Sequence, residues 1–193
     1  MNKFYSICRL NIIMWSIFFV TSIFFNYKIY ISGRSEENIE ILAEVGIPLI
    51  VILALTAYIT LIVFWKRMRD ISKSADKNMY TAATIGLISS IVHITLIIAP
   101  VAYVLESIAS IMLIKYFKGA QKTSIIVLFA VCIFMAFLTI LGIIYSIYLI
   151  VHDVSEMNEY AVYIQFFSSS IYYITYISFF ASLLRLKSNG KQQ

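Results

Sequence analysis

Long apolar stretches alternate with short polar segments along the chain, and this alternation predicts membrane-spanning helices. A helix needs about 20 apolar residues to cross the ~30 Å hydrocarbon core of a bilayer. Stretches of this kind occupy residues 10–27, 41–65, 80–98, 101–117, 124–151 and 160–184. We therefore expect an all-α, polytopic integral membrane protein, with a single transmembrane domain of six spans over residues 1–193.

The third and fourth spans come from one apolar stretch that contains a proline. From Tyr80 to Lys115 a single helix would be roughly 54 Å long, which is too long for one crossing. Pro100 lies near the middle, and proline disfavours helical geometry at the residue before it, here Ala99. We therefore expect two spans joined by a tight hairpin at Pro100.

The basic residues give the spans a direction, because short cytoplasmic loops are rich in Lys and Arg. With the amino terminus inside, the outer loops hold only Lys28 and Arg34 among the basic residues. Six acids join them there: Glu36, Glu37, Glu40, Asp153, Glu156 and Glu159. The inner side holds Lys3, Arg9, Lys66, Arg67, Arg69, Lys73, Lys77, Lys115, Lys118, Lys122, Arg185, Lys187 and Lys191. The charges therefore predict that both termini are cytoplasmic.

The first span has an alternative interpretation as a cleaved signal peptide, with Lys3 and Arg9 as its basic start. No small-x-small cleavage site follows the apolar run, where Phe24, Phe25 and Asn26 lie instead. We therefore expect a retained helix.

Composition agrees with a membrane protein and excludes several functions. The chain is 61% hydrophobic and 13% charged, whereas soluble domains are about half apolar and a quarter charged. Its net charge of +5 follows from the inner loops, so we expect no nucleic-acid partner. Nucleotide-binding, zinc-protease and serine-hydrolase motifs are absent from the sequence, and Cys8 and Cys132 lack metal-site spacing. We expect no catalytic, cofactor or metal site.

Two ionisable residues lie within the predicted hairpin. His93 is seven residues before Pro100 and Glu106 is six after it, so an antiparallel pair would place them level. We expect their side chains to approach within reach of a hydrogen bond or one bridging water. Such a pair either fastens the hairpin or forms part of a proton or solute site, because ionisable groups within membranes are costly.

The sixth span is the most polar one. Polar side chains recur at helical spacing on one face: Gln165, Ser169, Tyr172, Tyr173 and Tyr176. This face either packs against neighbouring helices or lines a solute cavity near His93 and Glu106.

A basic segment follows the second span. It is a candidate contact for anionic lipid or an acidic partner, and comprises Lys66, Arg67, Arg69, Lys73 and Lys77. Apolar residues at steps of three and four would let the helix continue along the inner surface; the alternative is an ordinary basic loop.

Two functions fit this small chain with few loops. The first is a non-catalytic subunit or partner protein of a larger membrane complex, or a homo-oligomer, in the plasma membrane. The alternative is a small-solute transporter or substrate-binding membrane component that uses His93, Glu106 and the sixth span. An intramembrane enzyme is disfavoured because no nucleophile stands near a base.

Overall fold

The computed structural model describes residues 2–31, 42–94, 99–152 and 159–189. These residues form helices and contain no strand, as the apolar pattern predicts. In chain order the elements are α1 (Asn2–Ile31), the π-helical turn η1 (Leu42–Gly46), α3 (Ile47–Ser72), α4 (Lys77–Ile94), α5 (Ala99–Leu113), the 3₁₀ turn η2 (Ile114–Tyr116), α6 (Gly119–Val151) and α7 (Glu159–Asn189).

Five stretches of the described residues are long and apolar enough to cross a membrane. They are Lys3–Phe25, Glu44–Ser72, Ala99–Tyr116, Gly119–Val151 and Phe167–Arg185. The helix α4, in the region of the predicted third span, is not among them. It is 18 residues long and begins with the polar residues Lys77 and Asn78.

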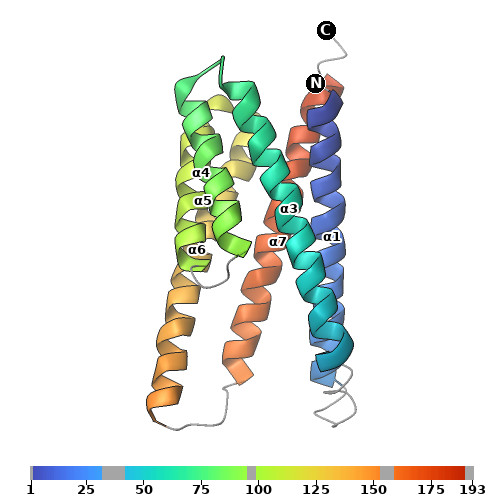
Figure 1. Ribbon diagram of the computed structural model, residues 1–193, viewed down its shortest axis with the longest axis vertical. Coiled ribbons are helices and arrows are strands. Elements are labelled where there is room, and N and C mark those ends of the chain that lie inside the picture. Colours follow the sequence, from blue (N-terminus) through green and yellow to red (C-terminus); the bar gives the residue numbers. More distant parts are fainter. Residues whose placement is uncertain (1, 32–41, 95–98, 153–158, 190–193) are drawn as a thin grey trace.

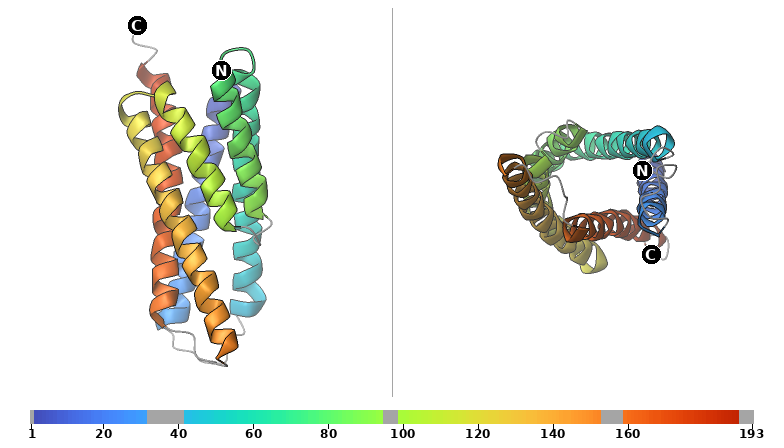
Figure 2. Two further views of the ribbon diagram at one scale, coloured as in Figure 1. Left: turned by 90° about the vertical axis from the view of Figure 1, so that its left-hand side faces the viewer. Right: turned by 90° about the horizontal axis from the view of Figure 1, so that it is seen from below.

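The long helices form a ring in which each packs against the next along the chain. α1 packs against α3, α3 against α4, α4 against α5, α5 against α6 and α6 against α7, and α7 returns to α1. The end-on view in Figure 2 shows this ring. α1 begins and α7 ends at the same end of the bundle as the α3–α4 turn (Figure 1).

The helix ends follow from local sequence. Pro48 and Pro100 stand in the first turns of α3 and α5, where proline is tolerated because the first backbone N–H groups have no partner within the helix. Asp76 caps α4, because its carboxylate accepts hydrogen bonds from the backbone N–H groups of Asn78 and Met79 at 2.8 and 3.0 Å. Gly119 begins α6 with a positive φ of 54°, which glycine adopts without strain.

The division of the long apolar stretch into two helices is present, but the break lies earlier than expected. α4 ends at Ile94 and α5 begins at Ala99, so Pro100 lies within the first turn of α5. Residues 95–98, which connect the two helices, lie outside the described residues. α4 and α5 pack against each other, and both are much shorter than the 33-residue α6 (Figure 1).

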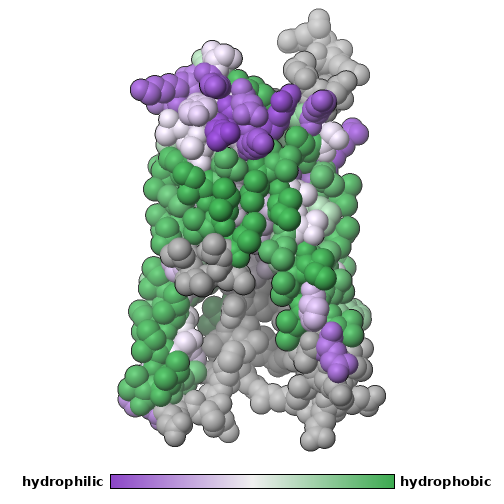
Figure 3. Space-filling view, viewed as in Figure 1, coloured by the Kyte–Doolittle hydropathy of each residue, from purple (hydrophilic) through white to green (hydrophobic). Residues whose placement is uncertain are grey.

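Hydrophilic side chains gather at the end of the molecule that carries the α3–α4 turn, above a broad apolar band (Figure 3). The acidic and basic side chains expected in the outer loops lie outside the described part of the chain. These are Lys28, Arg34, Glu36, Glu37, Glu40, Asp153, Glu156 and Glu159.

Candidate functional site: a buried polar cluster

A cluster of polar side chains lies inside the ring, and we call it the Glu106 cluster. Five helices contribute one residue each: Tyr58 on α3, His93 on α4, Glu106 on α5, Cys132 on α6 and Tyr172 on α7. Glu106 and Tyr172 are each 1% exposed, and His93 is 4% exposed. Two residues predicted as ionisable candidates therefore face the interior, together with one residue of the predicted polar face.

Glu106 is held by a single oxygen donor. The Tyr172 hydroxyl donates a hydrogen bond of 2.9 Å to Oε2 of Glu106. The other carboxyl oxygen, Oε1, has no nitrogen or oxygen partner among the described residues. The Cys132 thiol lies beside the carboxyl group, but a thiol is only a weak donor. The carboxyl group is therefore only partly satisfied.

His93 is held by its ring and by one ring nitrogen. Its Nδ1 lies 3.2 Å from the carbonyl oxygen of Ser89, which can only accept, so Nδ1 carries the proton. The ring stacks on Tyr58 at 5.0 Å between centroids and meets the edge of Tyr103 at 4.7 Å. Nε2 has no partner among the described residues. A second buried polar atom is thus left without a hydrogen bond.

The register of α4 against α5 explains why His93 and Glu106 are not bonded to each other. The Ser89 hydroxyl donates to the carbonyl oxygen of Ala102 at 2.7 Å, whereas counting from a turn at Pro100 places Ser89 and Ser90 opposite Ala109 and Ser110. The earlier turn therefore moves His93 one to two helical turns closer to the α4–α5 connection than Glu106. Tyr172 instead contacts both, because its ring lies 6.3 Å from that of His93.

An aromatic layer lines the ring next to the cluster. Trp15 on α1 stacks on Tyr176 with 4.8 Å between centroids and 6° between planes, and it meets the edge of Tyr172 at 6.1 Å. The indole Nε1 and the Tyr176 hydroxyl are both buried without a hydrogen-bond partner. Tyr173 packs against Phe18 on α1, 4.7 Å away. These contacts join α7 to α1.

The predicted polar face of the sixth span is thus divided. Tyr172 and Tyr176 are buried, whereas Tyr173 and Ser169 are partly buried and interact with each other. The side chain of Gln165 lies outside the described residues. Packing against α1 is the observed role of most of this face, and only Tyr172 also reaches the ionisable residues.

A separate polar contact joins α1 to α3. The Asn11 amide donates to the carbonyl oxygen of Thr60 at 3.0 Å, and the Thr60 hydroxyl donates back to Asn11 Oδ1 at 3.1 Å. Both residues are buried, so each satisfies the other away from water. The pair has the character of a structural fastening.

The predicted inner-surface contact lies where α3 ends. α3 continues past Trp65 to Ser72, so the basic segment is helical up to that residue and then turns sharply into α4. Lys66, Lys73 and Lys77 are exposed, whereas Arg67 and Arg69 are partly buried. A shallow hollow at the turn is lined by Lys73, Ser74, Ala75, Asp76, Lys77 and Tyr80.

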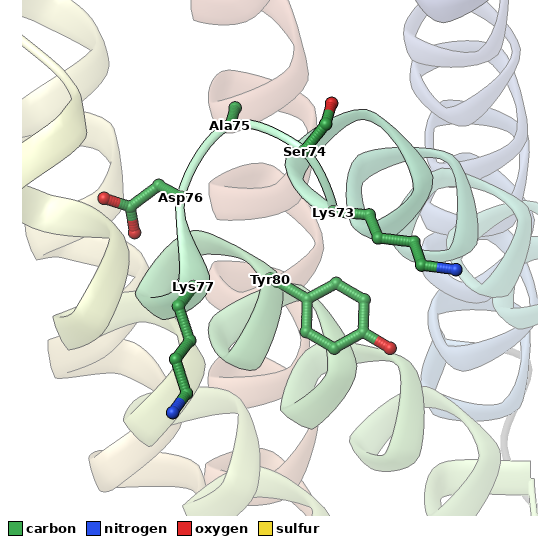
Figure 4. A pocket seen from close by; sticks show the side chains of 6 residues that line it. All are labelled: Lys73, Ser74, Ala75, Asp76, Lys77 and Tyr80. Carbon is green, nitrogen blue, oxygen red and sulfur yellow. The ribbon is translucent and has the colours of Figure 1, made fainter.

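The lining side chains of this hollow do not converge. Figure 4 shows Lys73, Asp76 and Lys77 pointing in different directions, away from a common point. Asp76 is engaged with Tyr116 of η2, whose hydroxyl donates to its carboxylate. This hydrogen bond lowers the pKa of Asp76 below its usual value. The turn is therefore a basic surface with an internal fastening, without the shape of a small-ligand site.

The chain matches no protein-family model, no curated protein and no solved structure. A function is therefore proposed from the geometry of the site. Among the described residues no group of three His, Cys, Asp or Glu side chains could hold a metal ion.

Several residues in and around the cluster were not among those predicted from the sequence. Tyr58, Tyr103 and Trp15 stand within apolar stretches, where an aromatic residue indicates packing as readily as a site. In the sequence, Cys132 was noted only for its lack of metal-site spacing. Helical spacing from Tyr58 to Trp65 puts both on the buried face of α3, but spacing within one helix does not show which helix that face meets.

Proposed function

We propose that the chain is a six-span protein of the plasma membrane with both termini in the cytoplasm, and that it serves as a non-catalytic subunit or partner protein of a larger membrane complex. The observation that carries this proposal is the outer half of α6. This segment makes few contacts within its own chain, so much of its surface is free to meet another membrane helix.

The exposure of α6 changes along its length. In the inner half, Ile125, Leu128 and Cys132 are buried against other helices. From Phe137 to His152 no residue is buried, and exposures reach 57% at Ile144 and 79% at Ile150. α5, the neighbour of α6 in the ring, ends its contact early because it is only 15 residues long (Figures 1 and 2).

Small residues on this segment suit a close helix contact. Gly142 and Ser146 are four residues apart and both exposed, which is the small-xxx-small spacing that lets helix backbones approach in membranes. A Cβ atom added at Gly142 would meet no atom within 4 Å. A larger side chain at position 142 therefore starts in open space among the described residues. If such a substitution abolishes association, the cause is a clash with the partner.

The test is purification in a mild detergent of the native protein, Gly142→Leu and the control Ile143→Leu, with the mass and composition of each particle measured. We expect the native protein and Ile143→Leu to elute with a partner polypeptide, or a second copy, in fixed ratio. Gly142→Leu should elute as a single chain whose thermal stability is not reduced. Elution of all three as the same single chain with lipid alone would contradict the proposed role.

The topology has its own test. Ser74 is exposed at the α3–α4 turn, while the native Cys8 and Cys132 are buried. A Ser74→Cys variant should react with a membrane-impermeant maleimide only after the inner face of the membrane is opened. Reaction in intact cells would show that the orientation is the opposite of the one proposed. The subunit role would still be tested by the association experiment.

A second function, a small-solute transporter or substrate-binding membrane component, is favoured by the buried atoms without partners. Nε2 of His93 and Oε1 of Glu106 lie in the same interior, and a solute with matching polar groups would satisfy them. Loss of uptake in a Glu106→Gln variant of unchanged stability would support this function. Unchanged uptake would leave these residues as structural.

A further inference from the structure

Glu106 carries a potential negative charge, and no basic side chain among the described residues forms an ion pair with it. An ion pair joins Arg69 to Asp70, far from Glu106 along the chain, at 3.9 Å. Glu106 is 1% exposed and lies on the interior face of a helix that is apolar enough to cross a membrane. A carboxylate in such surroundings requires a counter-charge or several strong donors.

The groups around Glu106 do not supply that balance. The titratable residues of the cluster come from every helix packed nearby: Tyr58 and Tyr172 supply hydroxyls, Cys132 a thiol and His93 an imidazole. Tyr103, on the same helix as Glu106, adds a further tyrosine. Of these, the Tyr172 hydroxyl alone makes a hydrogen bond of normal length to the carboxyl group. The hydroxyl and thiol groups are neutral when protonated and negative when deprotonated, so His93 alone among these groups could carry a positive charge.

His93 does not act as the missing cation. Its Nδ1–H is directed at the carbonyl oxygen of Ser89, and the register of the two helices separates it from Glu106 by one to two turns. Its ring lies between those of Tyr58 and Tyr103, at 5.0 and 4.7 Å. The histidine is therefore enclosed by aromatic rings.

We propose that the Glu106 carboxyl group is a proton-binding site inside the helix bundle, with Tyr172 as the residue that positions it. A bound proton neutralises the carboxylate, and it can sit on Oε1, which has no hydrogen-bond partner among the described residues. When the proton is bound, Oε1 carries it and Oε2 continues to accept from Tyr172. When the proton leaves, the carboxylate keeps the single bond from Tyr172.

Proton binding at Glu106 is coupled to the contact between α5 and α7 through the same hydrogen bond. The Tyr172 hydroxyl is the only donor to Glu106 that crosses between these two helices in the described residues. Its bond strengthens when the acceptor is charged, because a charged acceptor makes a stronger hydrogen bond than a neutral one. The protonation state of Glu106 therefore changes the strength of the contact between α5 and α7.

Infrared difference spectroscopy of the full chain in lipid vesicles tests the proposal, because a protonated carboxyl group has a carbonyl band that the carboxylate lacks. Spectra are compared from about pH 4 to about pH 10 for the native protein and Glu106→Gln. We expect a protonated-acid band that is lost as the pH rises, and that is absent from Glu106→Gln. Glutamine keeps an acceptor for Tyr172, so this variant should fold.

Two tyrosine variants test the part played by Tyr172. Tyr172→Phe removes the donor and keeps the ring, and it should shift both the frequency of the Glu106 band and the pH at which half of it is lost. Tyr173→Phe is the matched control, because Tyr173 interacts with Ser169 and Ser22 instead. It should leave both values unchanged.

Three outcomes would overturn the inference. A Glu106 band that persists at every pH means a permanently neutral structural acid, and its absence at every pH means a permanent carboxylate. A band that titrates identically in Tyr172→Phe and the native protein removes Tyr172 from the site. None of these outcomes depends on a partner or on solute uptake, so the proposed functions are tested separately.

Discussion

The contact between Gly86 on α4 and Trp65 on α3 leads to the sharpest stability prediction. Both residues are buried, and Trp65 is 1% exposed. A Cβ atom built on Gly86 would lie 2.5 Å from Cδ2 of the indole and 2.6 Å from Cε2. These atoms belong to the rigid ring itself, so the side chain has no flexible end that could move aside. Gly86→Ala should therefore force α3 and α4 apart.

The magnitude follows from two opposing effects. Overpacking a filled interior destabilises a protein by about 1–3 kcal/mol. Replacing glycine by alanine within a helix contributes roughly 1 kcal/mol in favour of the folded state. The net expectation is a loss of up to about 2 kcal/mol for Gly86→Ala. Gly142→Ala is the matched control, because its added methyl meets nothing within 4 Å, and it should gain up to about 1 kcal/mol.

The assay uses two buried thiols, Cys8 and Cys132, which react with a thiol-sensitive dye only when the fold opens. Dye reaction during heating in mild detergent gives the unfolding temperature of each variant. A double-mutant cycle with Trp65→Leu measures the coupling, and the cost of Gly86→Ala should largely vanish in that background. An unfolding temperature for Gly86→Ala equal to or above that of Gly142→Ala would refute the packing argument.

Two further predictions concern polar contacts. Ser89→Ala should lower stability by about 1 kcal/mol because it removes the hydrogen bond from α4 to α5. Ser90→Ala is the control and should change little, because among the described residues the Ser90 hydroxyl donates to the carbonyl oxygen of Gly86 within its own helix. The same dye assay compares the two variants, and equal losses would argue against the interhelical bond. Because the Tyr116 hydroxyl lowers the pKa of Asp76, this carboxylate contributes stability at neutral pH that is lost as the pH falls through and below the usual carboxyl range near 4. Asp76→Asn should therefore unfold at a lower temperature than the native protein at neutral pH, and the two unfolding temperatures should approach each other in acid. A difference that stays constant across pH would contradict this cause.

The helices were predictable because the thickness of the membrane sets the length of each apolar stretch. The register in which neighbouring helices pack was not predictable. Length and Pro100 together indicate that the stretch after Tyr80 divides into two helices, and it does. The register of those helices depends on where the turn lies, and a proline is tolerated in the first turn of a helix as readily as in the connection before it. That shift separates His93 from Glu106.

The site was partly predictable for a similar reason. Glu106 and His93 attract notice because ionisable groups are rare in apolar spans, and Tyr172 belongs to a face with helical spacing. Tyr58 and Cys132 join them only because α3 and α6 close around the same interior. A single sequence does not show which helix faces pack together, so Tyr58 and Cys132 could not be assigned to the site from the sequence.

The return of α7 to α1 has a consequence for how the protein is made. Trp15 on α1 is synthesised long before its stacking partner Tyr176 and its edge contact Tyr172, which belong to α7. During insertion α1 therefore has no partner for its indole until α7 has been translated. If translation stops before α7, the ring lacks the helix that packs between α6 and α1, and the indole of Trp15 stays exposed. We expect membrane quality control to recognise such an incomplete chain.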